Sequence, residues 1–302
     1  MANSLEGFLG TAQAVPKRIM PVFFLVDTSK SMEGQKIGAV NAAIEEILPD
    51  LRHMSESQAD SEIRLAVLRF STGCEWVTPG GLISLDSFGD WDALEAEGLT
   101  DLGSAFAELN AQLSETGFIY RVSGSSGFYA PVIILLSDGE PTDDWYGELK
   151  KLQQNKWYQS AIRIAIAVGD DADEEKLKKA IRNPELMFKV TNISSLKKVI
   201  KFIMVTSSTI ASSPAASNSQ NTYNPADVQP VIAEQKIADV IQQQMQTEFP
   251  KSNNTNPFPV PPAPTFPTQP APSFPMPSSP AFPDSSMGMG ASGGIVLLDD
   301  DE

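Results

Sequence analysis

Cysteine and histidine are nearly absent from this chain of 302 residues, which contains one of each. The lone Cys74 permits no internal disulfide, and such cysteine usage is typical of proteins kept in a reducing compartment. No Ser-His-Asp set is visible around His53, the one histidine. The phosphate-binding signature G-x-x-x-x-G-K-[ST] is missing as well. These absences disfavour serine-hydrolase and P-loop nucleotide chemistry.

Long apolar runs and basic residues are scarce too. No stretch of eighteen apolar residues is present, so the sequence predicts no membrane span. The first residues lack the basic and apolar regions of a signal peptide, and we therefore expect a cytoplasmic protein. There are 22 Lys and Arg residues against 38 Asp and Glu, which gives a net charge of −16. Nucleic acids and anionic membranes favour basic surfaces, so we expect neither as a partner, whereas a cationic partner is not excluded.

Proline divides the chain into two parts of different character. Of 23 prolines, 16 follow Ser207, and the segment from there to the end carries nine acidic and two basic residues. Such a composition buries too little apolar surface to fold. We therefore expect a flexible leader at 1–18, one folded domain at 19–206, and a disordered Pro/Ser-rich acidic tail at 207–302.

Two stretches of the tail have features of their own. Apolar residues at helical spacing predict a short helix within 230–246, either solvated or docked on another surface. Residues 295–302 place four aliphatic side chains before four acidic ones. That terminal motif fits either an ordinary chain end or a short ligand for a partner.

Short apolar runs alternate with amphipathic segments in the first two thirds of the chain. The runs predicted as strands are Val22–Asp27, Ile63–Phe70, Pro131–Leu136, Ala161–Val168 and, at the edges, Cys74–Val77, Leu82–Leu85 and Met187–Val190. The main predicted helices are Met32–Arg52, Gly103–Leu113, a helix from Thr142 as N-cap to Lys156, and Ser195–Met204. This alternation predicts an α/β fold with a doubly wound, mostly parallel sheet and one short antiparallel edge strand.

Three oxygen-bearing side chains follow the first predicted strand at two-residue spacing: Asp27, Ser29 and Ser31. They lie where a buried strand meets solvent, the place at which open α/β sheets bind ligands. Carboxylate and hydroxyl oxygens suit Mg²⁺ or Mn²⁺, with Ca²⁺ less favoured, rather than zinc. The alternative from spacing alone is an ordinary strand-to-helix turn in which Ser29 or Ser31 caps the helix.

Two later positions extend this pattern. Thr100 lies in a loop that feeds a helix, and Asp138 ends the strand Pro131–Leu136. The order D-x-S-x-S, then Thr, then Asp resembles the metal-ion-dependent adhesion site of von Willebrand factor A (VWA) domains, which are Rossmann-like. The resemblance covers Val22–Met204. The residues that match the family's metal ligands are Asp27, Ser29, Ser31, Thr100 and Asp138.

The resemblance implies a function as well as a fold. In the family, a carboxylate from a protein partner completes the coordination of the cation, and no catalysis is involved. The segment SDGEPTDDW at 137–145 is similar to bacterial VWA proteins associated with tellurium resistance, the TerY-like type. That similarity implies an adaptor in a bacterial stress-response or defence system, with a kinase or a PP2C-type phosphatase as candidate partners.

Two other functions stay open at this point. A phosphohydrolase of the haloacid-dehalogenase-like type also places an Asp after a buried strand and binds Mg²⁺. The motif of that family is D-x-D, however, and in this sequence Ser29 takes the place of the second acid. A scaffold protein with a vestigial metal site would show the same sequence.

Overall fold

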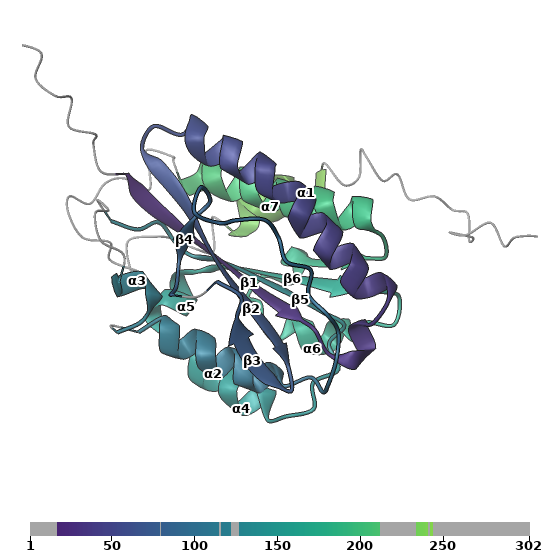
Figure 1. Ribbon diagram of the computed structural model, residues 1–302. Helices are drawn as coiled ribbons and strands as arrows, with labels where there is room; N and C mark the ends of the chain where they lie inside the picture. The colour runs from purple at the N-terminus through teal and green to yellow at the C-terminus, as the bar shows by residue number, and fades with distance from the viewer. Residues whose placement is uncertain are drawn as a thin grey trace, which may run out of the picture. The chain divides into compact units, whose positions relative to one another are not determined.

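A computed structural model describes residues 17–78, 80–114, 116–121, 127–211, 234–240 and 242–243. Within these ranges the chain forms one sheet of seven strands with helices on both faces (Figure 1). Most of the predicted leader, most of the predicted tail and the terminal motif 295–302 lie outside the described residues. Among the described residues, no helix combines the length and apolar character needed to cross a bilayer.

The sheet has the order β3-β2-β1-β5-β6-β7, with β4 paired to β2. Its strands are β1 (Arg18–Asp27), β2 (Ser61–Ser71), β3 (Gly73–Trp76), β4 (Ile83–Ser84), β5 (Val132–Ser137), β6 (Ile162–Val168) and β7 (Met187–Val190). The strands β1, β2, β5, β6 and β7 run parallel, whereas β3 and β4 lie antiparallel to β2. The predicted fold class is confirmed, and two short segments form its antiparallel edge.

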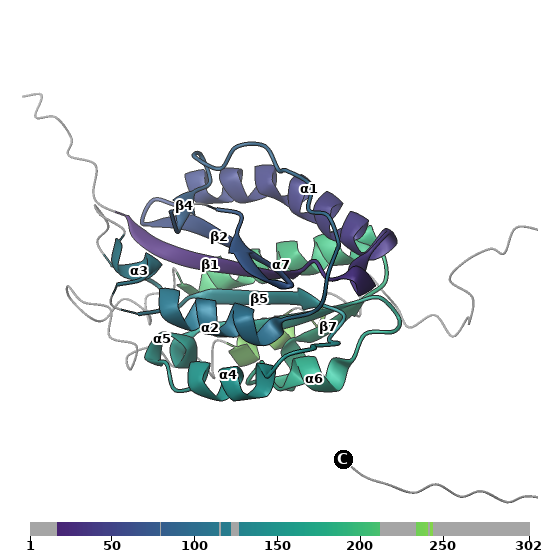
Figure 2. The same ribbon diagram turned by 60° about the horizontal axis from the view of Figure 1, so that its bottom comes forward.

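The central strand β1 is apolar because both of its faces are covered. Alternate side chains enter different cores: Phe24 and Val26 pack on one side, and Phe23 and Leu25 on the other. The helices α1 (Gln35–Ser57) and α7 (Ile193–Ala211) cover the first side. The second side is covered by α2 (Leu102–Gln112), α4 (Trp145–Leu152), α5 (Lys156–Ser160) and α6 (Glu174–Lys178). Figure 2 shows α1 and the pair α2–α4 on opposite sides of the strands. The short elements are η1 (Lys30–Met32), α3 (Phe118–Arg121) and η2 (Pro184–Leu186).

Several helix boundaries differ from the prediction. Helix α1 ends at Ser57 rather than at Arg52, and α7 runs from Ile193 to Ala211 rather than from Ser195 to Met204. The first long helix begins at Gln35 rather than at residue 32, because a 3₁₀ turn comes first and Gly34, with φ of +80°, stands at the N-cap. The predicted helix at 142–156 is instead two helices. Asp144 rather than Thr142 caps the first of them, accepting a hydrogen bond from the Gly147 N–H at 3.2 Å.

A helical segment at 234–240 packs on the sheet, in the same compact unit. Because β7 pairs with β6 only from Ala165 onward, no strand of the described residues lies beside the start of β6 on that edge. The Glu234 carboxylate accepts the hydrogen bond of the Arg163 N–H at 3.3 Å and so occupies this edge. Ile237 and Ala238 are fully buried in the core beneath α7.

Charge holds the first residue of this helical segment in place. The Glu234 carboxylate is 1% exposed and lies 3.9 Å from the Arg163 guanidinium and 3.6 Å from that of Arg182. Burial raises the pKa of Glu234, and the two arginines partly oppose that rise. The segment is therefore bound by apolar burial together with an ion pair of loose geometry.

We expect Glu234→Ala to release the segment from the edge of β6. The Arg163 amide would then lose its acceptor, and its hydrogen exchange should become at least about tenfold faster, equivalent to about 1.4 kcal/mol. Native-state hydrogen exchange with mass spectrometry measures this directly. The matched control is Lys236→Ala, an exposed position on the same segment. Equal exchange rates in the two variants would contradict the prediction.

Candidate metal centre

Two carboxylates meet at the carboxyl ends of the central strands. β1 and β5 are parallel neighbours, with Val26 opposite Leu136, so Asp27 at the end of β1 lies beside Ser137 and Asp138. The Ser137 hydroxyl donates a hydrogen bond to Asp27 Oδ2 at 2.5 Å. Both carboxylates are buried, with 0% exposure for Asp27 and 2% for Asp138.

The two serine hydroxyls of the D-x-S-x-S motif lie close to each other, and Ser29 also contacts Asp27. The Ser29 N–H donates to Asp27 Oδ1 at 2.8 Å, and the Ser29 and Ser31 hydroxyls lie 3.0 Å apart. Ser29 stands at the N-cap of η1 without a capping hydrogen bond from its side chain, and the N-cap of α1 is Gly34. Ser29 thus occupies a cap position, as the alternative interpretation predicted, but its hydroxyl does not cap the helix, and Ser31 is not an N-cap. Ser29 is buried, whereas Ser31 lies exposed at the rim.

The loop that carries Thr100 is fastened to this turn by its backbone. The Glu97 N–H donates to the Thr28 carbonyl at 2.8 Å, and the Lys30 N–H donates to the Gly98 carbonyl at 3.1 Å. These bonds hold Thr100, which is 4% exposed, against the turn that contains Ser29 and Ser31.

A second set of bonds fastens Thr100 to the loop after β5. The Thr100 N–H donates to Thr142 Oγ1 at 3.1 Å, and the Thr142 N–H donates back to the Thr100 carbonyl at 2.9 Å. The Thr142 hydroxyl also donates to Asp101 Oδ1 at 3.3 Å. Thr142 thus joins two loops, a role different from the helix cap that the sequence predicted.

Sequence reasoning did not identify the residue that fixes the start of α2. The Asp143 carboxylate accepts hydrogen bonds from the Gly103 and Ser104 N–H groups at 2.9 and 3.0 Å, so it caps a helix from another loop. A Cβ atom on Gly103 would lie 2.7 Å from Asp143 Oδ2, which explains the glycine. No local pattern could reveal this contact, because about forty residues separate its partners.

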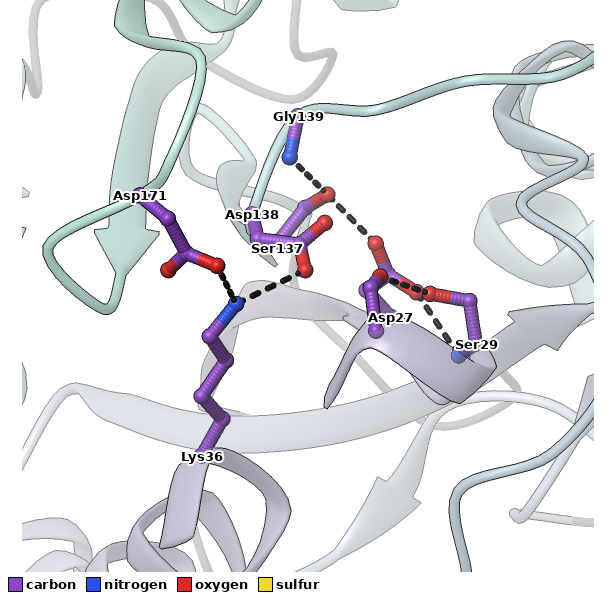
Figure 3. A network of polar contacts seen from close by, with 8 residues as sticks. Asp27, Ser29, Lys36, Ser137, Asp138, Gly139 and Asp171 are labelled. Atoms are coloured by element: carbon purple, nitrogen blue, oxygen red, sulfur yellow. Dashed lines mark hydrogen bonds and ion pairs between the residues drawn. The ribbon is translucent and has the colours of Figure 1, made fainter. Parts of the chain in front are cut away.

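The buried carboxylates carry an electrostatic cost, and part of it is compensated. Burial raises the pKa of Asp27, the hydrogen bonds from Ser137 and Ser29 oppose the rise, and the nearby Asp138 adds to it. Asp138 Oδ2 lies 3.1 Å from the Lys36 ammonium (Figure 3). Its other oxygen, Oδ1, is buried and finds no hydrogen-bond partner among the described residues.

These residues fit a hard divalent cation. The potential ligands are all oxygens, which suits Mg²⁺ or Mn²⁺. They comprise the carboxylate oxygen without a partner, a second buried carboxylate, and hydroxyl groups that make no helix-capping hydrogen bond. In the described part of the chain, no group of three or more His, Cys, Asp or Glu side chains could hold a metal. A site here must therefore combine two carboxylates with neutral hydroxyls. The five predicted ligands come from neighbouring segments, and their joint binding of one cation stays a prediction.

Comparison with known families decides the classification of this fold. Residues 22–202 match the family model for the von Willebrand factor type A domain. The chain belongs to this family. VWA domains typically bear a metal-ion-dependent adhesion site that binds divalent cations, and they are usually non-catalytic modules that bind protein partners.

Individual relatives are distant. Human inter-alpha-trypsin inhibitor heavy chain H6 is 30% identical over 174 residues, which cover 53% of this VWA protein and 12% of the human one. A von Willebrand factor type A structure from Catenulispora acidiphila is 17% identical with a TM-score of 0.46, covering 63% of this chain and 42% of that one. Proximal thread matrix protein 1 from the mussel byssus, solved with a zinc-occupied adhesion-site motif, is 16% identical with a TM-score of 0.45, covering 63% and 48%.

We expect the VWA domain to bind one Mn²⁺ or Mg²⁺ ion with a dissociation constant of about micromolar to millimolar, because two of its five oxygen ligands are charged. Asp27→Ala and Asp138→Ala should abolish binding while the fold is retained. Isothermal calorimetry with Mn²⁺ and circular dichroism measure the two effects. Asp86→Ala removes an exposed carboxylate of the same type and serves as control. Unchanged Mn²⁺ binding in both site variants would contradict the assignment.

The raised pKa of Asp27 predicts that its ionised carboxylate lowers the stability of the metal-free protein, although metal binding needs it. Because the folded pKa lies above the unfolded one, the free energy of unfolding falls as pH rises through the interval between them. Asp27→Asn removes this penalty, so in EDTA at pH 7 the variant should be at least as stable as wild type in urea titrations. Mg²⁺ at about 100 times its dissociation constant should stabilise only the wild type, by about 2.7 kcal/mol. A metal-free variant that is less stable than wild type would argue against this account.

Proposed function

We propose that this VWA domain is a metal-dependent protein-binding module in which a partner's Asp or Glu carboxylate completes the coordination of one divalent cation. Asp27, Ser29, Ser31, Thr100 and Asp138 hold the ion. The observation that carries the proposal is the unpartnered, buried Oδ1 of Asp138 beside serine hydroxyls that cap no helix. Hydroxyl ligands are neutral, so the bound ion keeps net positive character and attracts an anionic group.

Exposed apolar side chains flank the proposed site. Leu99 is 57% exposed and directly precedes Thr100, and Tyr146 is 46% exposed at the start of α4. The ring of Tyr146 also lies 4.4 Å from the Lys150 ammonium. These neighbours favour a partner segment that places apolar groups next to its metal-binding carboxylate.

The geometry gives the phosphohydrolase alternative little support. Such an enzyme needs Asp27 as an accessible nucleophile and a general acid two residues later. Here Asp27 is fully buried and both of its oxygens accept hydrogen bonds, from the Ser29 N–H and the Ser137 hydroxyl. The side chain at the second position is the Ser29 hydroxyl. A scaffold protein with a vestigial site differs from our proposal in one property, since it would not respond to metal.

The proposal extends to the biological setting. The similarity of the segment 137–145 to TerY-like proteins supports an adaptor in a bacterial stress-response, tellurium-resistance or defence system, with a kinase or PP2C-type phosphatase as partner. The single cysteine supports a cytoplasmic location. Fold-level analogy of this kind names candidates for testing.

Affinity capture from the native host, in Mg²⁺ and in EDTA, tests the proposed function. The tagged wild type should retain a partner in Mg²⁺ and lose it in EDTA, and Thr100→Ala should lose it in both. Ser87→Ala removes an exposed hydroxyl from the turn after β4 and should behave as wild type. Mass spectrometry identifies the retained protein, and carboxylate substitutions in that partner should then abolish binding.

Two results would contradict the proposal. Partner retention that is equal in Mg²⁺ and EDTA would favour the vestigial-site scaffold. Turnover of p-nitrophenyl phosphate by wild type that is lost in Asp27→Asn would establish a phosphohydrolase instead.

A further inference from the structure

Lys36 brings a positive charge into the proposed metal centre. It is the second residue of α1, and its side chain is 17% exposed. Its ammonium lies 3.1 Å from Asp138 Oδ2 and 2.8 Å from Asp171 Oδ2 (Figure 3). Burial alone would lower the pKa of Lys36, but the hydrogen bonds to Asp171 and Asp138 outweigh it and raise that pKa.

The loop after β6 is shaped to admit this side chain. Gly169 has φ of +101°, and a Cβ atom there would lie 2.6 Å from Lys36 Cε. The same loop carries Asp171, whose side chain is 72% exposed, and is tied to the metal centre by the Asp173 N–H, which donates to the Asp138 carbonyl at 2.7 Å. Lys36 thus passes over a glycine to reach one carboxylate inside the centre and one outside it.

The two oxygens of Asp138 have different environments. Oδ2 is bound by Lys36, whereas the buried Oδ1 has no partner among the described residues. A divalent ion on Asp138 would lie close to the Lys36 ammonium, and like charges in a buried site repel strongly. Lys36 has a second partner in Asp171, so it can give up Asp138 without becoming an unpaired buried charge.

We propose that Lys36 is an internal counter-cation that competes with the divalent ion for Asp138 and keeps the affinity of the isolated domain for that ion low. The proposal rests on the metal site proposed above. In the metal-free protein Lys36 compensates the charge of Asp138, and when the ion binds Lys36 gives up Asp138 and keeps only its bond to Asp171. A partner carboxylate adds a further ligand and so raises the affinity of the site for the divalent ion. Metal binding and partner binding are therefore coupled.

Mn²⁺ calorimetry on the full chain, without a partner, tests this inference. Lys36→Met should bind Mn²⁺ at least about tenfold more tightly than wild type, because the competing charge is gone, and Lys36→Arg should not. The control for net charge is Lys151→Met, which removes an exposed lysine paired with Glu148 on α4 and should change affinity by less than about threefold.

A second variant acts on the same equilibrium from the other side. Asp171→Asn removes the alternative partner of Lys36, so the ammonium binds Asp138 more firmly and Mn²⁺ affinity should fall at least about threefold. Asp170→Asn, at the neighbouring exposed acid, makes the same charge change and should alter affinity less. Because the Asp171 side chain is exposed, we expect Asp171→Asn to fold normally, so a loss of Mn²⁺ affinity would not reflect misfolding.

The outcomes separate this inference from the proposed metal site. Mn²⁺ binding by wild type that Asp138→Ala abolishes, together with an unchanged or weakened affinity in Lys36→Met, overturns the role of Lys36 and leaves the metal site intact. Such a result would make Lys36 a residue that orients Asp138 for the ion. Absence of Mn²⁺ binding in both wild type and Lys36→Met overturns the metal site and this inference together.

Discussion

Two buried carboxylates at one edge of the sheet set the conditions for the rest of this structure. Asp27 and Asp138 face a common centre because β1 and β5 are parallel neighbours, and neither side chain reaches bulk water. Burial of two like charges is costly unless each is compensated. The Ser137 hydroxyl and the Ser29 N–H supply hydrogen bonds to Asp27, and the Lys36 ammonium supplies a charge to Asp138. Among the described residues, the remaining oxygen, Asp138 Oδ1, has no hydrogen-bond partner.

The loops around this centre are held by one another as much as by the strands. The Thr100 loop is bonded to the turn after β1 on one side and to Thr142 on the other, and Asp143 caps the helix that follows Thr100. A hydroxyl ligand on a free loop would lose conformational entropy on binding a metal. These cross-loop bonds hold Thr100 in place, so a cation that used its hydroxyl would meet a ligand whose loop is already ordered.

The amino-terminal part of β6 has a side unpaired by any described strand, and the segment 234–240 covers it. β7 is too short to cover the start of β6, and the helical residues 234–240 occupy the exposed edge through Glu234 and bury Ile237. An unpaired strand edge invites association with other chains, so this segment protects the domain as well as extending it. Because it lies at the amino end of β6, it leaves the carboxyl edge with Asp27 and Asp138 open to a partner.

Much of the fold and the core of the candidate site follow from local sequence patterns. Five-residue apolar runs such as Val22–Val26 identify strands buried on both faces, because strand length and side-chain pattern are local properties. The spacing of D-x-S-x-S after one of them leaves an ordinary turn open, and the prediction of a metal site there depends on the resemblance to VWA domains. Lys36 could not be placed in this way. It contacts Asp138 and Asp171 across 102 and 135 residues of chain, and no periodicity encodes such distances. The same reason explains why Thr142, a plausible helix cap in sequence, bonds Thr100 instead. It also explains the burial of Ile237, which depends on β7 beginning opposite Ala165 and leaving the start of β6 to the segment 234–240. The sequence by itself determined which residues form strands and which oxygens follow them, whereas the packing of the loops decided which charges meet.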